Sequence, residues 1–244
     1  MKYSKLKVIS NKKISTDIFV LKIANYCDNI QPGQFYMIKS WDEQLPLLRP
    51  ISVYNVEVDT IHFMYRIVGE GTSKMSLLKK GSNIEVLGPL GNGFPIKQVK
   101  GKIALVGGGI GIPPLYETAK KLLELGNTVD IYLGYKDELF AFENFVDVAH
   151  NIFVTTENGK EGFKGYITDI FKPKNYDAVF TCGPEVMMFK VRDMSEAQNV
   201  PSWLSMEKHM ACGVGACLVC NCDTKKGTLR TCKDGPVFLG SDLL

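Results

Sequence analysis

The chain has 244 residues, of which 45% are hydrophobic and 23% are charged, and its formal net charge is +3. This composition is close to the globular average and argues against disordered, collagen-like and coiled-coil proteins. The small net charge gives no reason to expect binding to nucleic acid or to a membrane surface. The uneven feature is cysteine, because five of the seven cysteines lie between positions 212 and 232.

The sequence favours a soluble protein of the cytoplasm. Residues 1–8 carry charges but no apolar run, so we expect no secretory signal. The longest uncharged apolar stretch, 103–116, is shorter than the roughly 20 residues that a membrane span needs. In the cytoplasm a group of cysteines more often binds metal or does redox work than forms disulfides.

Residues 1–98 are predicted to form a small antiparallel β-barrel, because short apolar runs alternate with turn signals. These runs are 6–9, 18–23, 35–38, 61–67 and 84–87. One helix is expected to interrupt the barrel at residues 74–80. Thr72 or Ser73 would cap this helix, and Met75, Leu77 and Leu78 would face inward.

Residues 99–205 show strands that alternate with helices, which predicts a parallel sheet covered on both faces. The expected strands are 102–106, 128–133, 151–155, 178–182 and 201–205, and the expected helices are 113–125 and 185–198. Residues 206–244 are rich in glycine and cysteine and have too few apolar residues for a core of their own. We therefore expect two domains followed by a small cysteine-held third domain.

A glycine-rich run, Val106-Gly-Gly-Gly-Ile-Gly-Ile-Pro-Pro114, follows an apolar strand and opens a helix. Glycines at such a turn let the backbone approach a pyrophosphate at the positive end of the helix. The spacing is not G-x-G-x-x-G, so tight packing is an equally good explanation of this motif by itself. The candidate phosphate-binding residues are Gly107, Gly108, Gly109 and Gly111.

A second motif, Cys182-Gly183-Pro184, ends another predicted parallel strand. Ligands of open α/β sheets bind at this carboxyl edge, although a buried cysteine before a helix start would look the same. Together with the glycine run it predicts a shared ligand crevice. Asp137 and Glu138 follow the second strand, where an acidic residue favours NAD over NADP, but Lys136 is adjacent to them.

The barrel half contains two arginine motifs, Arg49-Pro-Ile-Ser52 and Arg66-Ile-Val-Gly-Glu-Gly-Thr72. Each places a guanidinium, which suits phosphate, near hydroxyls and backbone N–H groups. Gly71 and Thr72 also lie near the expected helix start, a further place for an anion. A solvated strand residue is the ordinary alternative for a single arginine, and the spacing alone does not name a ligand.

The most specific pattern is Cys212-x4-Cys217-x2-Cys220-x11-Cys232. A C-x4-C-x2-C run with a distant fourth cysteine is the spacing of plant-type [2Fe-2S] clusters. Zinc is the main alternative, but zinc ribbons usually have two separated C-x2-C pairs. Cys222 is left over as a packing residue or a substitute ligand, and none of the three histidines has a partner at metal spacing.

The order of these motifs resembles the ferredoxin–NAD(P)H reductase superfamily. Within it, residues 206–220 and 232–238 look like the electron-transfer subunits of class 1B dihydroorotate dehydrogenases, and the glycine run 107–116 is similar to that family too. The resemblance spans essentially the whole chain. It implies an FAD-binding barrel, an NAD-binding α/β domain and a terminal [2Fe-2S] domain.

The resemblance also implies a role for each motif. FAD would be bound by Arg49, Pro50, Ile51, Ser52, Arg66, Ile67, Val68, Gly71 and Thr72. NAD, as substrate, would be bound by Gly107, Gly108, Gly109, Gly111, Cys182, Gly183 and Pro184. The cluster would be held by Cys212, Cys217, Cys220 and Cys232. Ile51 stands where the superfamily often has a tyrosine that stacks on the flavin, so this residue gives no aromatic stack.

The function implied is electron transfer without an acid–base residue. Electrons from the FMN of a separate dihydroorotate-oxidising subunit would pass through the cluster and FAD to NAD⁺, in a heterotetramer of two catalytic and two electron-transfer subunits. A related FAD/[2Fe-2S] NAD(P)H reductase subunit of a ferredoxin or hydrogenase complex is the nearest alternative. In the ferredoxin–NADP⁺ transhydrogenase type an aspartate commonly replaces the first cysteine, so Cys212 argues against it. A third alternative is a regulatory or binding module with a zinc-held C-terminal tail. Such a protein would be colourless, whereas a protein with flavin and an iron–sulfur cluster absorbs visible light.

Overall fold

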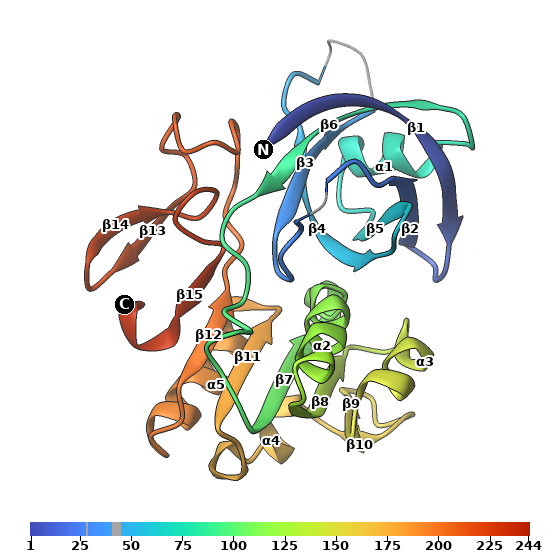
Figure 1. Cartoon of the computed structure of the whole chain (residues 1–244). Helices are drawn as coiled ribbons and strands as arrows, with labels where there is room; N and C mark the ends of the chain where they lie inside the picture. The colour runs from blue at the N-terminus through green and yellow to red at the C-terminus, as the bar shows by residue number, and fades with distance from the viewer. Residues whose placement is uncertain (28, 41–44) are drawn as a thin grey trace.

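The computed structural model describes residues 1–27, 29–40 and 45–244. The N-terminal part is a closed barrel with the strand order β1-β2-β5-β4-β3-β6, in which every neighbouring pair is antiparallel. The strands are β1 (Lys2–Lys13), β2 (Ile18–Ala24), β3 (Phe35–Lys39), β4 (Arg49–Val56), β5 (Thr60–Arg66) and β6 (Asn83–Leu90). Side chains such as Leu21, Tyr36 and Phe63 fill its interior. The predicted barrel is confirmed (Figure 1).

Three details of the helix predicted within the barrel are wrong, namely its bounds, its capping residue and the inward position of Leu77. The helix is α1 (Glu70–Ser76), which begins and ends four residues earlier than expected, with Gly69 as its N-cap. Thr72 instead occupies the third helical position, from which its hydroxyl accepts the backbone N–H of Val68 at 2.9 Å and that of Gly69 at 3.2 Å. Because the helix ends early, Leu77 is 75% exposed and does not face inward, whereas Met75 is buried.

The second part is built on a seven-stranded sheet with the order β10-β9-β8-β7-β11-β12-β15. Its strands are β7 (Lys102–Gly108), β8 (Thr128–Tyr135), β9 (Asn151–Thr156), β10 (Phe163–Lys164), β11 (Ala178–Cys182), β12 (Ser202–Ser205) and β15 (Val237–Leu239). All neighbours are parallel except β12 and β15. The sheet predicted from the alternating pattern is therefore present, with one antiparallel strand added at its edge from the C-terminal segment.

Helices cover both faces of this sheet, as the sequence predicts. The helices are α2 (Pro114–Glu124), α3 (Phe142–Phe145), α4 (Ile167–Ile170) and α5 (Glu185–Glu196). Short 3-10 turns span Gly109–Gly111, Val146–Val148, Pro173–Asn175 and Gly240–Asp242. Alternate residues of a strand point to opposite faces, so Leu105 of β7 packs with Leu115 of α2, whereas Val106 packs with Val191 of α5.

The C-terminal segment lies beside both of these parts (Figure 1). It contains the hairpin β13 (Asn221–Thr224) and β14 (Gly227–Arg230), and then returns to the sheet as β15. Cys220 and Cys232 pack against Phe35 and Met37 of the barrel. Among the described residues, no helix is long and apolar enough to cross a membrane.

Candidate functional site

A cavity of about 1000 Å³ lies where the barrel, the sheet domain and the C-terminal segment meet, and we call it the large cavity. Its barrel wall includes seven residues of the two arginine motifs, namely Arg49, Pro50, Ile51, Ser52, Arg66, Val68 and Thr72. Ile67 and Gly71, predicted with them, lie in the same turn but outside this wall. β4 and β5 are adjacent strands, so the barrel brings two motifs together that are separate in the sequence.

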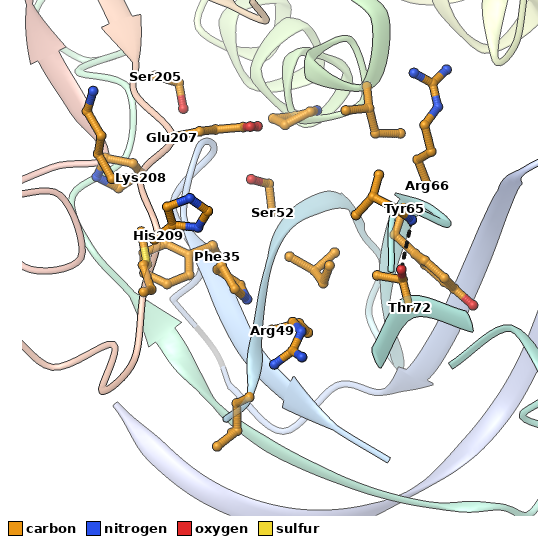
Figure 2. Close-up of a pocket in the computed structure, with 18 of the residues that line it drawn as sticks. Phe35, Arg49, Ser52, Tyr65, Arg66, Thr72, Ser205, Glu207, Lys208 and His209 are labelled. Carbon is orange, nitrogen blue, oxygen red and sulfur yellow. Dashed lines mark hydrogen bonds between the residues drawn. The ribbon is translucent and has the colours of Figure 1, made fainter. Parts of the chain in front are cut away.

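Hydrogen bonds and an ion pair hold the polar side chains of this wall in position. The Thr72 hydroxyl accepts two backbone N–H groups and donates to the Gly69 carbonyl at 3.0 Å, so it shapes the turn before α1 (Figure 2). The Arg66 Nε lies 3.1 Å from the Asp17 carboxylate, and the Arg49 guanidinium donates to the Leu47 carbonyl at 2.7 Å. A guanidinium carries five N–H donors in a planar fork, which is the donor pattern that suits a phosphate.

A smaller cavity of about 350 Å³ adjoins this region, and we call it the small cavity. It is lined by Gly108, Gly109, Ile110, Gly111, Gly183, Pro184, Glu185 and Met188, together with Arg66 and Glu207. The glycine run and the Cys-Gly-Pro motif therefore do share one crevice, because β7 and β11 pair directly and place Gly107 opposite Cys182. Arg66, Ile110 and Glu207 line both cavities.

Glycine is required at this crevice for space. A Cβ at Gly111 would lie 2.5 Å from the Gly183 backbone, and a Cβ at Gly107 would lie 2.9 Å from the side chains of Ile112 and Leu115. Tight packing therefore accounts for Gly107 and Gly111, whereas a Cβ at Gly109, which lines the small cavity, would meet nothing within 4 Å. Gly107 and Cys182 are buried behind the crevice and do not line it.

Cys182 is surrounded by groups that keep its thiol protonated. Burial is the main cause of its raised pKa, the charge of Glu207 adds to it, and a hydrogen bond with Ser205 opposes it. Cys182 and Ser205 are register partners at the carboxyl ends of β11 and β12. A neutral thiol beside the crevice can pack against an apolar ring but cannot act as a thiolate nucleophile.

A third wall of the large cavity was not among the predicted binding residues. Ser205, Met206, Glu207, Lys208, His209, Met210 and Ala211 line it opposite the barrel, and Figure 2 shows Glu207 and His209 facing the same space as Ser52. The available signal was the position of this segment directly after a parallel strand, where ligands gather. Protein atoms crowd the Glu207 carboxyl although the cavity leaves it open to solvent, and burial raises its pKa.

The four cysteines of the C-x4-C-x2-C…C pattern lie close together as two pairs. The Cys212 side chain hydrogen-bonds with that of Cys217, and the Cys232 side chain with that of Cys220. Cys220 and Cys232 are each 2% exposed, whereas Cys217 is exposed. Within the described ranges, no three His, Cys, Asp or Glu side chains converge on one point that could hold a single metal ion.

This pairing fits a two-iron cluster better than zinc. Each iron of a [2Fe-2S] cluster takes two thiolates, whereas a structural zinc takes four ligands at one point. The loop also directs backbone N–H groups at the sulfurs: Val214 and Ala216 lie 3.4 Å from the Cys212 Sγ, and Gly215 lies 3.1 Å from the Cys232 Sγ. Such donors stabilise thiolates and tune a cluster.

The two pairs differ in their electrostatic surroundings. Burial opposes ionisation of Cys212, but the N–H groups of Val214, Cys217 and Ala216 and the Cys217 thiol lower its pKa to about 6. Burial, with the neighbouring Cys220 thiol, raises the pKa of Cys232 to about 12. Cys222 takes no part, because it is buried in a separate apolar cluster with Leu204 and Phe238.

The remaining candidates lie elsewhere. Asp137 accepts a hydrogen bond from Asn158 at 3.2 Å, and Glu138 accepts one from Ser15 at 3.3 Å. Both stand outside the lining of the two cavities. His62 and His150 are in structural hydrogen bonds, with Thr60 and with the Val129 N–H respectively. Only His209 lies at the site.

Comparison with known proteins identifies the family. Residues 207–244 match the iron-sulfur cluster binding domain of dihydroorotate dehydrogenase B. The electron transfer subunit of dihydroorotate dehydrogenase B (NAD(+)) from Clostridium acetobutylicum is 48% identical to this chain, over 100% of it and 98% of the relative. The corresponding subunit of Clostridium perfringens is 44% identical over the same shares. The chain belongs to the electron transfer subunits of dihydroorotate dehydrogenase B.

Solved structures agree with this family. The structure of an NADH-dependent reduced ferredoxin-NADP oxidoreductase has a TM-score of 0.87 and 29% identity, and the match covers 98% of this chain and 89% of that one. A ferredoxin NADP⁺ reductase from Neisseria gonorrhoeae with bound FAD and NADP shares the fold, with a TM-score of 0.67 over 81% and 92%. The predicted family, fold and role as an oxidoreductase subunit are confirmed, and the expected FAD, [2Fe-2S] cluster and NAD agree with these matches.

Proposed function

We propose that this chain carries electrons between a catalytic partner subunit and NAD, and that each of its sites holds one cofactor. FAD binds in the large cavity, the [2Fe-2S] cluster is held by Cys212, Cys217, Cys220 and Cys232, and NAD enters the small cavity. When bound, FAD supplies the chemistry that links the others, since it exchanges a hydride with NAD and single electrons with a cluster.

The observation that carries the proposal is the convergence of three predicted sites. The large cavity is lined by the arginine motifs, by Ile110 and Pro114 at the start of α2, and by residues 205–211 that lead directly into Cys212. It shares Arg66, Ile110 and Glu207 with the small cavity. Groups held in these places would lie side by side, which is what electron transfer requires.

The proposed role of the residues that line the cavities is to bind and orient FAD and NAD. Arg49 and Arg66 offer guanidinium donors to the phosphates of FAD, and Ser52 stands at the centre of the large cavity (Figure 2). Gly108, Gly109, Gly111 and Gly183 line the small cavity, where the loop before α2 would bind the pyrophosphate of NAD and the Cys-Gly-Pro turn would lie near its nicotinamide. Gly107, Cys182, Ile67 and Gly71 support these walls from behind.

The cluster loop connects the large cavity to the surface. Cys220 and Cys232 pack in one apolar cluster with Phe35, which also lines the large cavity, so water is kept out between the two sites. On the outer side Cys217 is exposed beside Leu218, which is 59% exposed, and Val219, which is 53% exposed. This apolar rim around the outer pair suits contact with the partner subunit.

The partner in this proposal is an FMN-containing, dihydroorotate-oxidising subunit in the cytoplasm, in a complex of two catalytic and two electron-transfer subunits. The names of the relatives, which describe an electron transfer subunit, support a partner of this kind. The proposed division of the chain is an FAD-binding barrel (1–98), an NAD-binding domain (99–205) and a cluster domain (206–244), whose strand β15 completes the sheet of the second.

A second candidate function is that of a reductase subunit in a ferredoxin complex. The likeness to the NADH-dependent reduced ferredoxin-NADP oxidoreductase favours it, because that structure covers nearly the whole chain. Full-length relatives at higher identity favour dihydroorotate dehydrogenase. Co-purification decides between them: the dehydrogenase assignment predicts an FMN protein that oxidises dihydroorotate, whereas a ferredoxin-oxidising partner would support the second function.

The proposed route is tested with Cys217→Ser in the assembled complex. Loss of one cluster ligand should abolish electron transfer from dihydroorotate to NAD⁺, because FAD is then cut off from the partner. NADH oxidation by an artificial two-electron acceptor should continue at close to the wild-type rate, since it needs only FAD and NAD. Physiological transfer that survives in protein shown by iron analysis to lack the cluster would overturn the route.

A further inference from the structure

An ion pair on helix α2, between Glu117 and the partly buried Lys120, is hydrogen-bonded to the barrel strand β4. Glu117 is 1% exposed, and its Oε2 accepts the backbone N–H of Val56 at 3.0 Å. The same oxygen accepts the Lys120 ammonium at 2.9 Å. Lys120 also donates to the Asn55 Oδ1 at 2.6 Å and to the Val56 carbonyl at 3.3 Å. One turn of the helix is thereby attached to two successive residues of the strand, and we call these contacts the clamp.

A β-bulge makes the attachment possible. The pairing of β4 with β5 shifts register between Val53 and Asn55, and a bulge of this kind re-aims the side chains around it. Tyr54, at the shift, packs on Tyr116 of α2 with ring centroids 5.2 Å apart. Its hydroxyl accepts a hydrogen bond from the Asn144 amide. The strand thus turns both an aromatic ring and a backbone N–H toward the helix.

The clamp adds directional hydrogen bonds to an interface between the two domains that also has apolar contacts. Ile18 and Met64 of the barrel share an apolar cluster with Ile112 and Leu115 of the sheet domain. Apolar burial attracts the two domains but is non-directional, so it permits sliding. A hydrogen bond to a backbone N–H is directional, and a carboxylate as buried as Glu117 is strongly disfavoured without its partners.

Both cavities lie close to the clamp along rigid elements. Ser52 of the large cavity is four residues from Val56 on β4, about 13 Å along the strand. Pro114, which also lines the large cavity, is one turn from Glu117. Gly107, at the end of β7, leaves no room for a side chain next to Ile112 and Leu115, so the strand that leads into the glycine loop is closely packed against the start of α2. Movement at the clamp therefore changes the placement of one cavity wall relative to the other.

We propose that Glu117 is a positioning residue for hydride transfer, which sets the orientation of the small cavity relative to the large one without touching either ligand. This inference rests on the proposed function, because it takes FAD and NAD as the ligands of these cavities. Hydride transfer is steeply sensitive to geometry, since a misplacement of about 1 Å can cost on the order of 100-fold in rate. A clamp between the two binding elements is thus a means of setting the rate.

The test uses the full-length holoprotein and follows flavin reduction by NADH in a stopped-flow instrument. Glu117→Ala should lower the limiting rate about tenfold or more, with FAD content and the half-saturating NADH concentration close to wild type. Glu117→Gln should restore most of the rate, because its amide oxygen can still accept the Val56 N–H. Lys121→Met is the matched control, since it removes an exposed ion pair with Glu124 from the same helix and should change nothing.

A merely structural role would not separate these variants. A wild-type limiting rate in FAD-loaded Glu117→Ala, or an equally slow Glu117→Gln, overturns the inference. If Glu117→Ala does not fold, Lys120→Met carries the test, because it removes the contacts to Asn55 and to the Val56 carbonyl and should slow reduction in the same direction. Unchanged reduction in Lys120→Met would then overturn the inference.

The clamp also has a readout that needs no cofactor chemistry. The Val56 amide should exchange hydrogen faster in Glu117→Ala than in wild type or in Glu117→Gln, because its acceptor is lost. Faster exchange without a slower limiting rate contradicts the positioning role. A wild-type flavin that NADH does not reduce would instead overturn the proposed function.

Discussion

The cluster loop and the large cavity are each suited to hold a redox group, but they are built in opposite ways. The cluster loop concentrates its binding groups: the four proposed ligands are four of the five cysteines between positions 212 and 232, and backbone N–H groups of the same segment point at the sulfurs. The large cavity distributes them over the barrel, the start of α2 and residues 205–211. Concentrated binding fails when one member is lost, whereas distributed binding weakens by degrees.

The largest expected effect is the loss of one cluster ligand. Cys220→Ala removes half of the buried pair, leaves Cys232 without its partner, and should reduce the bound iron and the transfer of electrons from the partner subunit to background. Iron analysis and electron paramagnetic resonance of the reduced protein measure the first effect. A Cys220→Ala variant that still binds a full cluster, with Cys222 as the substitute ligand, would contradict the difference between the two sites, because the cluster loop would then tolerate the loss of a ligand.

Cys222→Ala is the control for that substitution. Cys222 lies two residues away but packs with Leu204, Met206 and Phe238 on the side of α5. We expect full iron content and a loss of roughly 1 kcal/mol in the free energy of unfolding, the usual cost of trimming a buried side chain. Thermal denaturation of the two variants side by side separates a ligand from a packing residue.

The loss of one arginine from the large cavity should have an effect of intermediate size on FAD binding. Arg66→Met keeps the length of the side chain but removes its charged donors from both cavities, so FAD affinity should fall about tenfold to a hundredfold, the value of one charge-assisted contact. Fluorescence titration of the deflavinated protein with FAD measures it. Lys5→Met, which removes an exposed barrel cation paired with Glu85, should leave the affinity unchanged. An all-or-none loss of FAD in Arg66→Met would contradict distributed binding.

A third change should affect NAD alone. Gly111→Ala introduces a Cβ that meets the Gly183 backbone at 2.5 Å, so the loop must move out of the small cavity. We expect the Michaelis constant for NADH to rise about tenfold while the FAD and iron contents stay constant. Gly126→Ala is the control for backbone strain alone, since its φ is +79° and its added Cβ would meet nothing within 4 Å, whereas Gly111→Ala acts through the contact with Gly183. Loss of FAD in Gly111→Ala would show that the two cavities are one site.

The same contrast explains what the sequence could predict. The cluster residues share one local segment, so their spacing alone indicates an iron–sulfur site. The strands 178–182 and 18–23 are also local signals, because a buried strand needs little more than an apolar run. Each of these predictions depends on neighbours in the sequence.

Residues that depend on tertiary structure were missed. The sequence does not predict strand β4, because polar residues and a proline interrupt its apolar pattern, namely Arg49, Pro50, Ser52 and Asn55. In the structure β4 pairs with a strand on each side. Glu207 and His209 lie in the family-like stretch 206–220, but that resemblance assigns them no binding role, and the pairing of β12 with β11 brings them to the cavity. The helix α1 was placed too late because Thr72 reaches back to the Gly69 N–H from inside the helix instead of capping it from in front.

The smallest predicted effect concerns pH and the clamp between the barrel and helix α2. His62 is 3% exposed on β5, next to Asn55 of the clamp. Burial lowers its pKa, the positive charges of Lys22 and Lys120 add to this, and the Glu57 carboxylate opposes it. In the neutral ring Nε2–H can donate to Thr60 at 2.8 Å while Nδ1 accepts from the Asn55 amide at 3.4 Å.

The sign of the pH effect follows from the lowered pKa. The folded protein binds fewer protons at His62 than the unfolded chain does, so the stabilising contribution is complete above the ordinary histidine range and is lost as pH falls toward the folded-state pKa. Protonation would also set an N–H of the ring against the Asn55 amide and loosen the clamp. The thermal midpoint should therefore drop less between pH 7.5 and 5.5, as chosen assay conditions (about one unit either side of the ordinary value), in His62→Gln than in wild type. A His62 imidazole that titrates by NMR at or above the ordinary histidine value would contradict this prediction, because acid would then not destabilise the folded protein through His62.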